Sequence, residues 1–320
     1  MSNLAQSAVA LGGGHGLYTT LRALRRLLDD LTIDDLSAVV TVADNGGSSG
    51  RLRDEFPVVP PGDLRMALAA LCGEDDWGRT WERLAQHRFG GSGQMHGHAV
   101  GNLLIVGLWE LFGDPVAALD LVGQLLRARG RVLPMATEPL DIHADVRGLD
   151  PDDPTALRPV TGQVEVATTP GHIARVALSP AGVAACPEAV AAVEQAEWVF
   201  LGPGSWFSSV VPHLLLPGLR DALVRRGDRL VLVLNVGTQD EETSGYSPAS
   251  QLRGLAELAP GLRFHTVLAD PASVGDADDL AAAVTELGGR LVVEPIADPD
   301  GSPRHDVTLL SAALARVMLG

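Results

Sequence analysis

Short apolar runs rich in β-branched residues alternate along this chain with longer segments of helical periodicity. Ala8–Leu11 predicts a first strand, and the segment Leu17–Asp30 that follows it has leucines at helical spacing. The alternation returns with a strand over Trp198–Leu201 and ends with a helix over Asp306–Leu319. Strands that alternate with helices pair in parallel, because the helix carries the chain back to the same edge of the sheet. The sequence therefore predicts an α/β fold with a doubly wound, mainly parallel sheet.

The other predicted elements follow the same alternation. Ser37–Val42 is expected to form a second strand that is buried on both faces. Further strands are predicted at Leu230–Asn235, Phe264–Leu268 and Leu291–Glu294. Further helices are predicted at Leu64–Leu71, Trp77–His87, His98–Leu111, Pro115–Arg127, Pro187–Gln195, Gly218–Arg226, Pro248–Leu258 and Asp276–Leu287.

Residues 131–180 differ in character from the rest of the chain. Strand-like runs at Arg131–Pro134, Asp141–Val146, Gln163–Ala167 and Ile173–Leu178 are separated by turns rich in Pro, Asp and Gly. We expect an antiparallel insertion or sheet extension here, with Gly148–Pro159 as a mobile loop. Since no repeat or low-complexity linker divides the chain, residues 1–320 are predicted to form one domain with this β-rich excursion.

The composition excludes several classes of function. Asp and Glu number 40 against 24 basic residues, and the formal net charge of -16 disfavours binding to nucleic acid or to an anionic membrane. All the basic residues are Arg, so the chain has no lysine for a P-loop or a Schiff base. Its two cysteines form no disulfide framework, and its most apolar stretch, around Leu103–Trp109, is too short to span a bilayer. A soluble, cytoplasmic protein is predicted.

The first predicted strand runs into a glycine-rich turn that contains Gly13, Gly14 and His15 and then opens a helix. Glycines let the backbone turn sharply, and a helix N-terminus offers unpaired N–H groups to an anion. The spacing matches neither of the standard nucleotide-binding glycine motifs. The turn is therefore either a phosphate site or a tight strand–helix connection.

The second predicted strand ends in a polar segment, Ala43–Arg53. In open α/β sheets ligands bind at the carboxyl edge of the strands, so this segment is either a ligand site or a solvated loop. Asp63 follows it at the start of a helix, as a helix cap or as a ligand, and Asp44 and Asp63 are candidates to share one Mg²⁺. The candidate residues in this part of the chain are Asp44, Asn45, Ser48, Ser49, Arg51 and Asp63.

Three further groups of residues are candidates for ligand contacts. His98 and Asn102 are one helical turn apart, so both can face a ligand, although a capping histidine is an alternative. A second glycine-rich turn follows the strand Trp198–Leu201 and contains Gly202, Gly204 and Ser205. Arg304, just before the last helix, is either a phosphate-binding arginine or a surface residue beside a helix cap.

Taken in this order, the motifs resemble those of the YvcK family, the cytoplasmic sugar-nucleotide-binding proteins also called gluconeogenesis factors. They resemble more distantly the phospholactate transferases of deazaflavin-coenzyme synthesis, which share a CofD-like, Rossmann-like fold with that family. The resemblance covers essentially the whole chain. It rests on the segments Leu11–Leu17, Ala43–Arg51, Pro60–Arg65, Gly97–Asn102, Gly202–Ser205 and Arg304–Asp306.

The resemblance implies that the chain binds UDP-N-acetylglucosamine and links central carbon metabolism to cell-wall synthesis and cell shape. It also implies that Arg304 contacts the nucleotide sugar. Two positions depart from the family pattern. Asn45 stands where many members have a second Asp, and Asn235–Thr243 keeps Gln239 and Thr243 but lacks the usual Pro-Gly pair.

The leading hypothesis is a regulatory protein without catalytic residues that acts through an unidentified cell-wall or metabolic protein. The alternative is a Mg²⁺-dependent transferase that moves a phospholactate-type group from a nucleotide diphosphate donor. A nicotinamide dehydrogenase is disfavoured by the glycine spacing. A homodimer and bound Mg²⁺ are both compatible with the sequence.

Overall fold

The computed structural model describes residues 6–43, 45–237 and 245–320. Its strands are β1 (Ser7–Gly12), β2 (Asp35–Val40), β3 (Arg131–Pro134), β4 (Asp141–Arg147), β5 (Arg158–Thr161), β6 (His172–Ser179), β7 (Trp198–Leu201), β8 (Leu230–Val233), β9 (Thr266–Ala269) and β10 (Arg290–Val293). Its helices are α1 (Gly14–Asp29), α2 (Gly47–Glu55), α3 (Pro61–Ala70), α4 (Asp76–Gln86), α5 (Val100–Phe112), α6 (Pro115–Leu126), α7 (Gln163–Ala167), α8 (Pro187–Gln195), α9 (Val211–Leu215), α10 (Pro217–Arg225), α11 (Pro248–Leu258), α12 (Ala277–Glu286) and α13 (Val307–Leu319). A π-helical turn, η1 (Trp206–Val210), and a 3-10 turn, η2 (Pro271–Ser273), complete the list.

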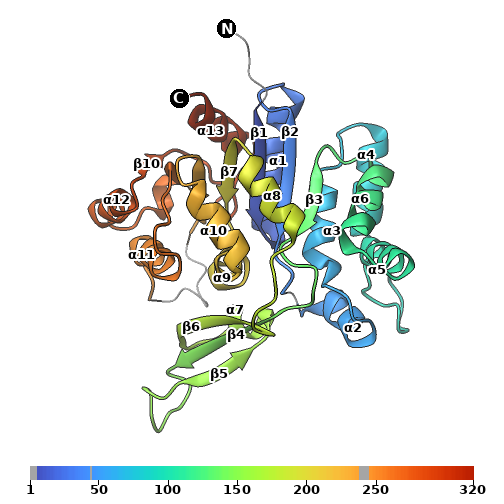
Figure 1. Ribbon diagram of the computed structural model, residues 1–320, viewed down its shortest axis with the longest axis horizontal. Coiled ribbons are helices and arrows are strands. Elements are labelled where there is room, and N and C mark those ends of the chain that lie inside the picture. Colours follow the sequence, from blue (N-terminus) through green and yellow to red (C-terminus); the bar gives the residue numbers. More distant parts are fainter. Residues whose placement is uncertain (1–5, 44, 238–244) are drawn as a thin grey trace.

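The central sheet has seven parallel strands in the order β10-β9-β8-β7-β1-β2-β3. Helices cover both of its faces, with α1 packed between α3 and α13 on one face and α8 beside α10 on the other (Figure 1). Strands covered on both faces become continuous apolar runs, as in β8, where all four residues are buried. The predicted doubly wound α/β fold is confirmed.

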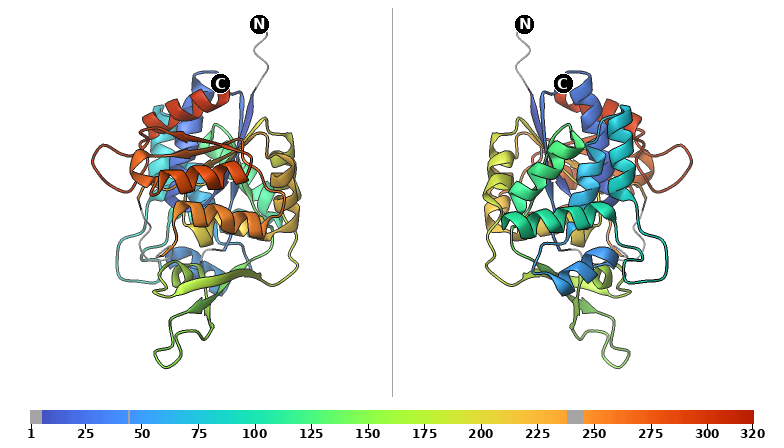
Figure 2. Two further views of the ribbon diagram at one scale, coloured as in Figure 1. Left: turned by 90° about the vertical axis from the view of Figure 1, so that its left-hand side faces the viewer. Right: turned by 90° about the vertical axis from the view of Figure 1, so that its right-hand side faces the viewer.

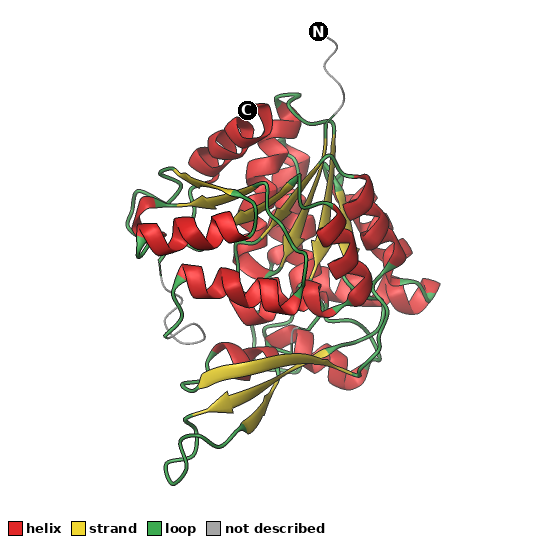
Figure 3. Ribbon diagram, turned by 60° about the vertical axis from the view of Figure 1, so that its left-hand side comes forward, coloured by secondary structure: helices red, strands yellow, loops and turns green. Residues whose placement is uncertain are grey.

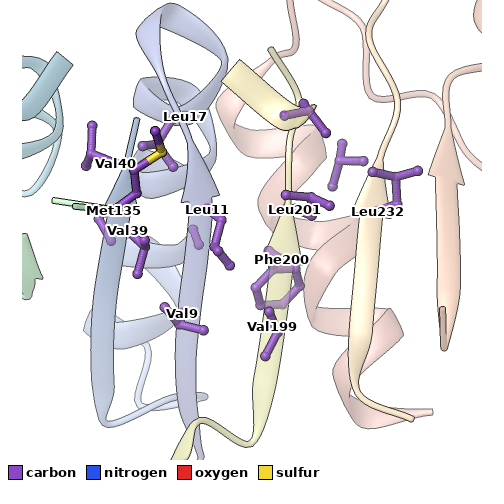
Figure 4. Close-up of a cluster of buried hydrophobic side chains, with 14 of the residues drawn as sticks. Val9, Leu11, Leu17, Val39, Val40, Met135, Val199, Phe200, Leu201 and Leu232 are labelled. Carbon is purple, nitrogen blue, oxygen red and sulfur yellow. The ribbon is translucent and has the colours of Figure 1, made fainter. Parts of the chain in front are cut away.

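The core lies between the sheet and its two helical layers. Figure 4 shows Val9 and Leu11 of β1 beside Val39 of β2 and Phe200 of β7. Leu17, at the start of α1, is also buried and packs against this group. This packing holds the carboxyl ends of β1, β2 and β7 in a fixed relation to one another. In the described ranges no helix is both long and apolar enough to cross a membrane.

The insertion is a separate three-stranded antiparallel sheet in the order β5-β4-β6, together with α7. It projects from the end of the main sheet at which the central strands finish (Figures 1 and 2). Figure 3 shows its strands well apart from the central ones. Asn45 attaches α7 to the main body, since its Nδ2 donates to Glu165 Oε2 at 3.0 Å. Tyr246 attaches β6, since its hydroxyl donates to the carbonyl of Ile173.

The predicted strand Arg131–Pro134 is present as β3, and of the two alternatives it is the sheet extension: it is the edge strand of the central sheet, parallel to β2. One sequence prediction in the insertion was wrong. Gln163–Ala167 alternates like a strand but forms α7, because the backbone turns at Gly162 (φ +106°) and Asn45 Oδ1 accepts from the Val164 N–H at 3.3 Å. The third strand of the insertion is instead β5, which begins inside the predicted mobile loop Gly148–Pro159.

Two helical segments were missed where the sequence is rich in Gly and Ser. The segment after β2 forms α2, whose side chains Ser48, Ser49 and Leu52 are buried. The segment after β7 forms η1 and continues directly into α9. In both places tertiary burial overrides a local composition that is typical of a loop.

Candidate functional site

The strand order places the candidate site between β1 and β7. The chain proceeds from β1 to β2 and β3 in one direction, and from β7 to β8, β9 and β10 in the other. The strand order therefore reverses between β1 and β7. Where it reverses, the loops after the two neighbouring strands run in opposite directions and leave a crevice at the carboxyl edge of the sheet. A cavity of about 670 Å³ opens there, and we call it the cleft. Its lining includes both glycine-rich turns, the α7 segment of the insertion, and Arg304 with His305.

The first glycine-rich turn presents backbone N–H groups to the cleft. Gly13 is the N-cap of α1, and the helix begins at Gly14, whose φ is +57°. The first turn of α1 contains no acidic residue, so no side-chain carboxylate of that turn occupies the positive end of the helix dipole. A Cβ on residue 13 would lie 2.4 Å from Thr41 Cγ2 and 2.6 Å from Asp63 Oδ2, so any other residue would have to displace these side chains.

The second glycine-rich turn packs directly against the first. A Cβ on Gly16 would lie 2.2 Å from the carbonyl oxygen of Pro203, which shows how closely the two backbones approach. Asn235, just after β8, binds both polar groups of Gly204. Its Oδ1 accepts from the Gly204 N–H at 2.9 Å, and its Nδ2 donates to the Gly204 carbonyl at 2.8 Å. The turns therefore form one continuous surface of backbone donors and acceptors.

The charge of the cleft differs from that of the whole chain. Among the described residues that line it there is no Asp or Glu, although the chain contains 40 of them. Arg304 supplies a cationic group; its guanidinium makes a 3.3 Å ion pair with Asp300 and a 3.1 Å bond from Nε to Ser302 Oγ. Its side chain is still 67% exposed, so a ligand can reach it. Hydroxyls of Ser205, Ser208 and Ser209 complete a lining that suits an anion.

His305 fixes the segment that carries Arg304. Its Nε2 donates to the carbonyl of Leu234 at 3.0 Å, and burial lowers the pKa of His305 to about 4. His213 of α9 is fully buried, with its Nε2 3.2 Å from the Val39 carbonyl of β2, and burial lowers its pKa to about 4 as well. Both imidazoles are neutral at pH 7.

The lowered pKa values of His213 and His305 predict that the free energy of unfolding depends on pH. A folded-state pKa near 4 lies below the ordinary 6.5, so unfolding takes up protons between these values, and the stability present above pH 6.5 is lost as the pH falls toward 4. Each histidine contributes at most on the order of 3 kcal/mol to this loss. Urea unfolding at a series of pH values should show a shallower loss for His305→Gln than for the wild type. Parallel profiles would contradict the assignment.

A second group of predicted site residues lies outside the cleft lining and forms a buried network. Ser48 Oγ lies 3.1 Å from His98 Nδ1 and accepts from Asn102 Nδ2 at 3.0 Å. Arg65 Nε donates to Asn102 Oδ1 at 2.9 Å. Burial lowers the pKa of His98, which keeps the ring neutral. The polar atoms of these side chains connect α2, α3 and α5, so the network positions helices.

The remaining predicted residues are divided among several places. Ser49 is buried in α2, and Arg51 donates to the carbonyls of Gln94 and His96 at 3.2 and 2.9 Å. Asn45 contacts α7 as described above. Asp44, one of the two proposed Mg²⁺ ligands, lies outside the described residues, as do Gln239 and Thr243.

Asp63 is the described carboxylate of the proposed magnesium pair. It lies in the first turn of α3, is 9% exposed and reaches the backbone of the first glycine-rich turn at Gly13. A carboxylate beside a glycine-rich turn at a helix N-terminus fits Mg²⁺, which proteins bind with one or two carboxylates together with substrate phosphates. Within the described ranges, no three His, Cys, Asp or Glu side chains gather as a metal site.

Sequence reasoning missed two contributors to the cleft, Asn235 and Thr168. Asn235 was noted only as the start of a divergent segment, although an Asn at the carboxyl end of a parallel strand is itself a signal. Ser208 and Ser209 belong to the hydroxyl-rich segment that the sequence shows after the second glycine-rich turn, and they also line the cleft. Thr168, with the α7 helix, was not foreseen at the cleft, because its position there depends on how the insertion packs.

Comparisons with known proteins agree with this architecture. A family model described as "2-phospho-L-lactate transferase CofD" matches residues 8–284. A crystal structure of a UPF0052 family member from Bacillus halodurans superposes with a TM-score of 0.82 at 31% identity, covering 97% of this chain and 98% of that one.

Curated relatives are similar over most of the chain. A protein named "Putative gluconeogenesis factor" from Mycobacterium tuberculosis is 50% identical over 314 residues, which is 97% of this chain and 90% of the relative. The "Gluconeogenesis factor" of Bacillus subtilis is 35% identical over 265 residues, covering 83% of this chain and 78% of the relative. The chain therefore belongs to the CofD family and, within it, to the YvcK group of gluconeogenesis factors.

Proposed function

We propose that this chain is a cytoplasmic regulatory protein that binds UDP-N-acetylglucosamine in the cleft. It would act through a protein partner to link gluconeogenic metabolism to cell-wall synthesis and cell shape. The names of the relatives from M. tuberculosis and B. subtilis support the metabolic part of this proposal. The chemistry of the cleft supports an anionic nucleotide ligand.

The observation that carries the proposal is the contact between the two glycine-rich turns. Because Gly16 and Pro203 touch through their backbones, the first-turn amides of α1 and the Ser205–Ser209 segment border one continuous space. A diphosphate suits such a surface, since backbone N–H groups and a helix N-terminus bind phosphate oxygens well. The volume of about 670 Å³ is within the ~300–1,000 Å³ that small-molecule sites occupy, which leaves room for a nucleoside and a sugar.

The described lining offers no carboxylate for turnover, and its imidazoles are those of His15 and His305. The described lining residues include no carboxylate that could serve as a general base or as a covalent nucleophile. The hydroxyls of Ser205 and Ser208 are hydrogen-bonded to each other. His305 uses its Nε2 proton to bind Leu234 and is fixed in the neutral form.

Calorimetric titration with UDP-N-acetylglucosamine tests the proposal. Arg304→Ala should weaken binding about 10- to 100-fold, because a hydrogen bond from a charged donor contributes about 1.5–3 kcal/mol. Arg316→Ala is the matched control: Arg316 is similarly exposed and paired with an acidic residue, Glu294, but lies outside the cleft. Recovery of intact ligand after long incubation supports a sensor. No saturable binding, or equal effects of the two variants, would refute it.

The position of Asp63 favours a second candidate, a transferase of the type that the family model describes. In that case Asp63 would hold Mg²⁺ beside the first glycine-rich turn, and the metal would neutralise charge on a transferring phosphoryl group. Asp63→Asn should then remove the effect of Mg²⁺ on ligand binding and abolish product formation. Ligand binding that is insensitive to Mg²⁺, without any product, would exclude this candidate.

A further inference from the structure

A groove of about 360 Å³ lies at the edge of the sheet opposite to the cleft, and we call it the amino-edge groove. Its polar lining comes from the start of four neighbouring strands, β7 to β10. Trp198 and Arg290 are the first residues of β7 and β10, while Arg229 and His265 directly precede β8 and β9. The last turn of α13 supplies an apolar wall. In Figure 1 this end of α13 lies at the far end of the molecule from the insertion.

The charge of this groove is also opposite to that of the chain. Two guanidinium groups and one imidazole line it, and its described lining residues include no Asp or Glu side chain, so the terminal carboxylate of Gly320 is the negative group of the lining. Within the described part of the chain, neither Arg229 nor Arg290 has a carboxylate within ion-pair distance, whereas arginines elsewhere, such as Arg253 and Arg316, are paired. In a protein of net charge -16, two unpaired arginines at one place form a local positive site.

The two guanidinium groups and the imidazole are held in place by contacts that leave other donors available. The Cζ of Arg229 lies 4.9 Å from the centre of the Trp198 ring, a cation–π contact that uses the face of the guanidinium and not its N–H groups. Arg290 Nε donates to Thr266 Oγ1 at 3.2 Å, and this hydroxyl lies 2.9 Å from His265 Nδ1. Because the Thr266 hydroxyl accepts from Arg290, its proton can be donated to Nδ1, and Nε2 then carries the single N–H of the neutral ring.

The electrostatics around His265 agree with an uncompensated positive field. Burial lowers the pKa of His265, and Arg290 and Arg229 lower it further. Asp228 acts in the opposite direction but is the smallest of these influences. An anion bound between the two guanidinium groups would offset their positive charge, and the surrounding charges would then raise the pKa of His265 instead of lowering it.

We propose that the amino-edge groove binds the phosphate group of a small phosphorylated metabolite, as a site separate from the cleft. Guanidinium groups match phosphate oxygens in bidentate geometry, and the imidazole N–H adds a further donor. The apolar wall from α13 suits the carbon part of such a metabolite. Strand β7 begins at Trp198 in this groove and ends at the second glycine-rich turn, so the two sites lie at opposite ends of one strand.

Titration of the full chain with inorganic phosphate, followed by NMR of labelled histidine rings, tests this proposal. The ring signal of His265, assigned by its loss in His265→Gln, should shift saturably with a Kd of about 1 mM or below. Arg229→Gln and Arg290→Gln should each weaken this titration about tenfold or more. Acetate at the same concentration should produce a much smaller shift, because one carboxylate carries less charge than phosphate.

Two controls separate this site from the cleft. Arg304→Ala changes the cleft and should leave the His265 titration unchanged. Arg225→Gln removes an exposed arginine of α10 that is paired with Glu194 of α8, outside the groove, and should also have no effect. No shift of His265 up to about 20 mM phosphate, or a shift that persists in Arg229→Gln, would overturn the proposal. Stronger binding of acetate than of phosphate would overturn the assigned ligand class.

Discussion

Replacing Gly16 by alanine should destabilise the protein by about 3 kcal/mol and weaken nucleotide-sugar binding by more than about 100-fold. The new methyl group would lie 2.2 Å from the carbonyl oxygen of Pro203, 2.6 Å from its carbonyl carbon and 2.9 Å from the Cα of Gly204. All three are backbone atoms, so no side-chain rotation can relieve the clash. The two glycine-rich turns must separate, and the surface proposed for the diphosphate is then lost.

Urea unfolding and calorimetry on the same samples measure the two effects. Gly107→Ala is the matched control, because Gly107 is exposed in the interior of α5 and a Cβ there meets no atom within 4 Å. This control should raise stability by about 0.5–1 kcal/mol, the helix preference of alanine over glycine, and leave binding unchanged. Wild-type binding by Gly16→Ala would show that the contact between the turns is not needed for the ligand.

The position of the cleft could be predicted from the sequence because it depends on local signals. A buried strand that runs into a glycine-rich turn and a helix ends at the carboxyl edge, and two such units in one parallel sheet bring Gly13 and Gly204 to the same edge. The strand order, which decides whether the two turns are neighbours, is not encoded locally. It follows from the pairing of β1 with β7, whose residues are about 190 positions apart in the chain.

The roles of Ser48, His98 and Asn102 could not be predicted in this way. A polar side chain after a strand can face a ligand or bind another buried polar group, and composition does not distinguish the two. The structure pairs Ser48 with both His98 and Asn102, so these side chains connect α2 to the start of α5. The helical conformation of α7 could not be predicted locally either, because it depends on the contact of Asn45 with Val164, which joins residues 119 positions apart.

Replacing Asn235 by aspartate should weaken nucleotide-sugar binding by more than about 100-fold at neutral pH, with almost no change in side-chain shape. Asn235 Oδ1 can still accept from the Gly204 N–H as a carboxylate oxygen, but the second oxygen then faces the Gly204 carbonyl, which Nδ2 now binds at 2.8 Å. The change also puts a negative charge into a cleft whose described lining contains no carboxylate. Repulsion therefore acts on both the turn and the anionic ligand.

Lowering the pH should restore part of the affinity of Asn235→Asp, because a protonated carboxyl group can donate to the Gly204 carbonyl as the amide does. The diphosphate diester keeps its charge over this range, so the recovery reports the introduced carboxyl group. Asn235→Ala separates the two causes: it loses both bonds to Gly204 but adds no charge, and its affinity should be intermediate at neutral pH and lack this recovery. Calorimetry at pH about 7 and about 5 compares the variants in conditions where the fold persists. Equal affinities of the two variants at both pH values would show that charge in the cleft does not control binding, and the proposed diphosphate position between the turns would be wrong.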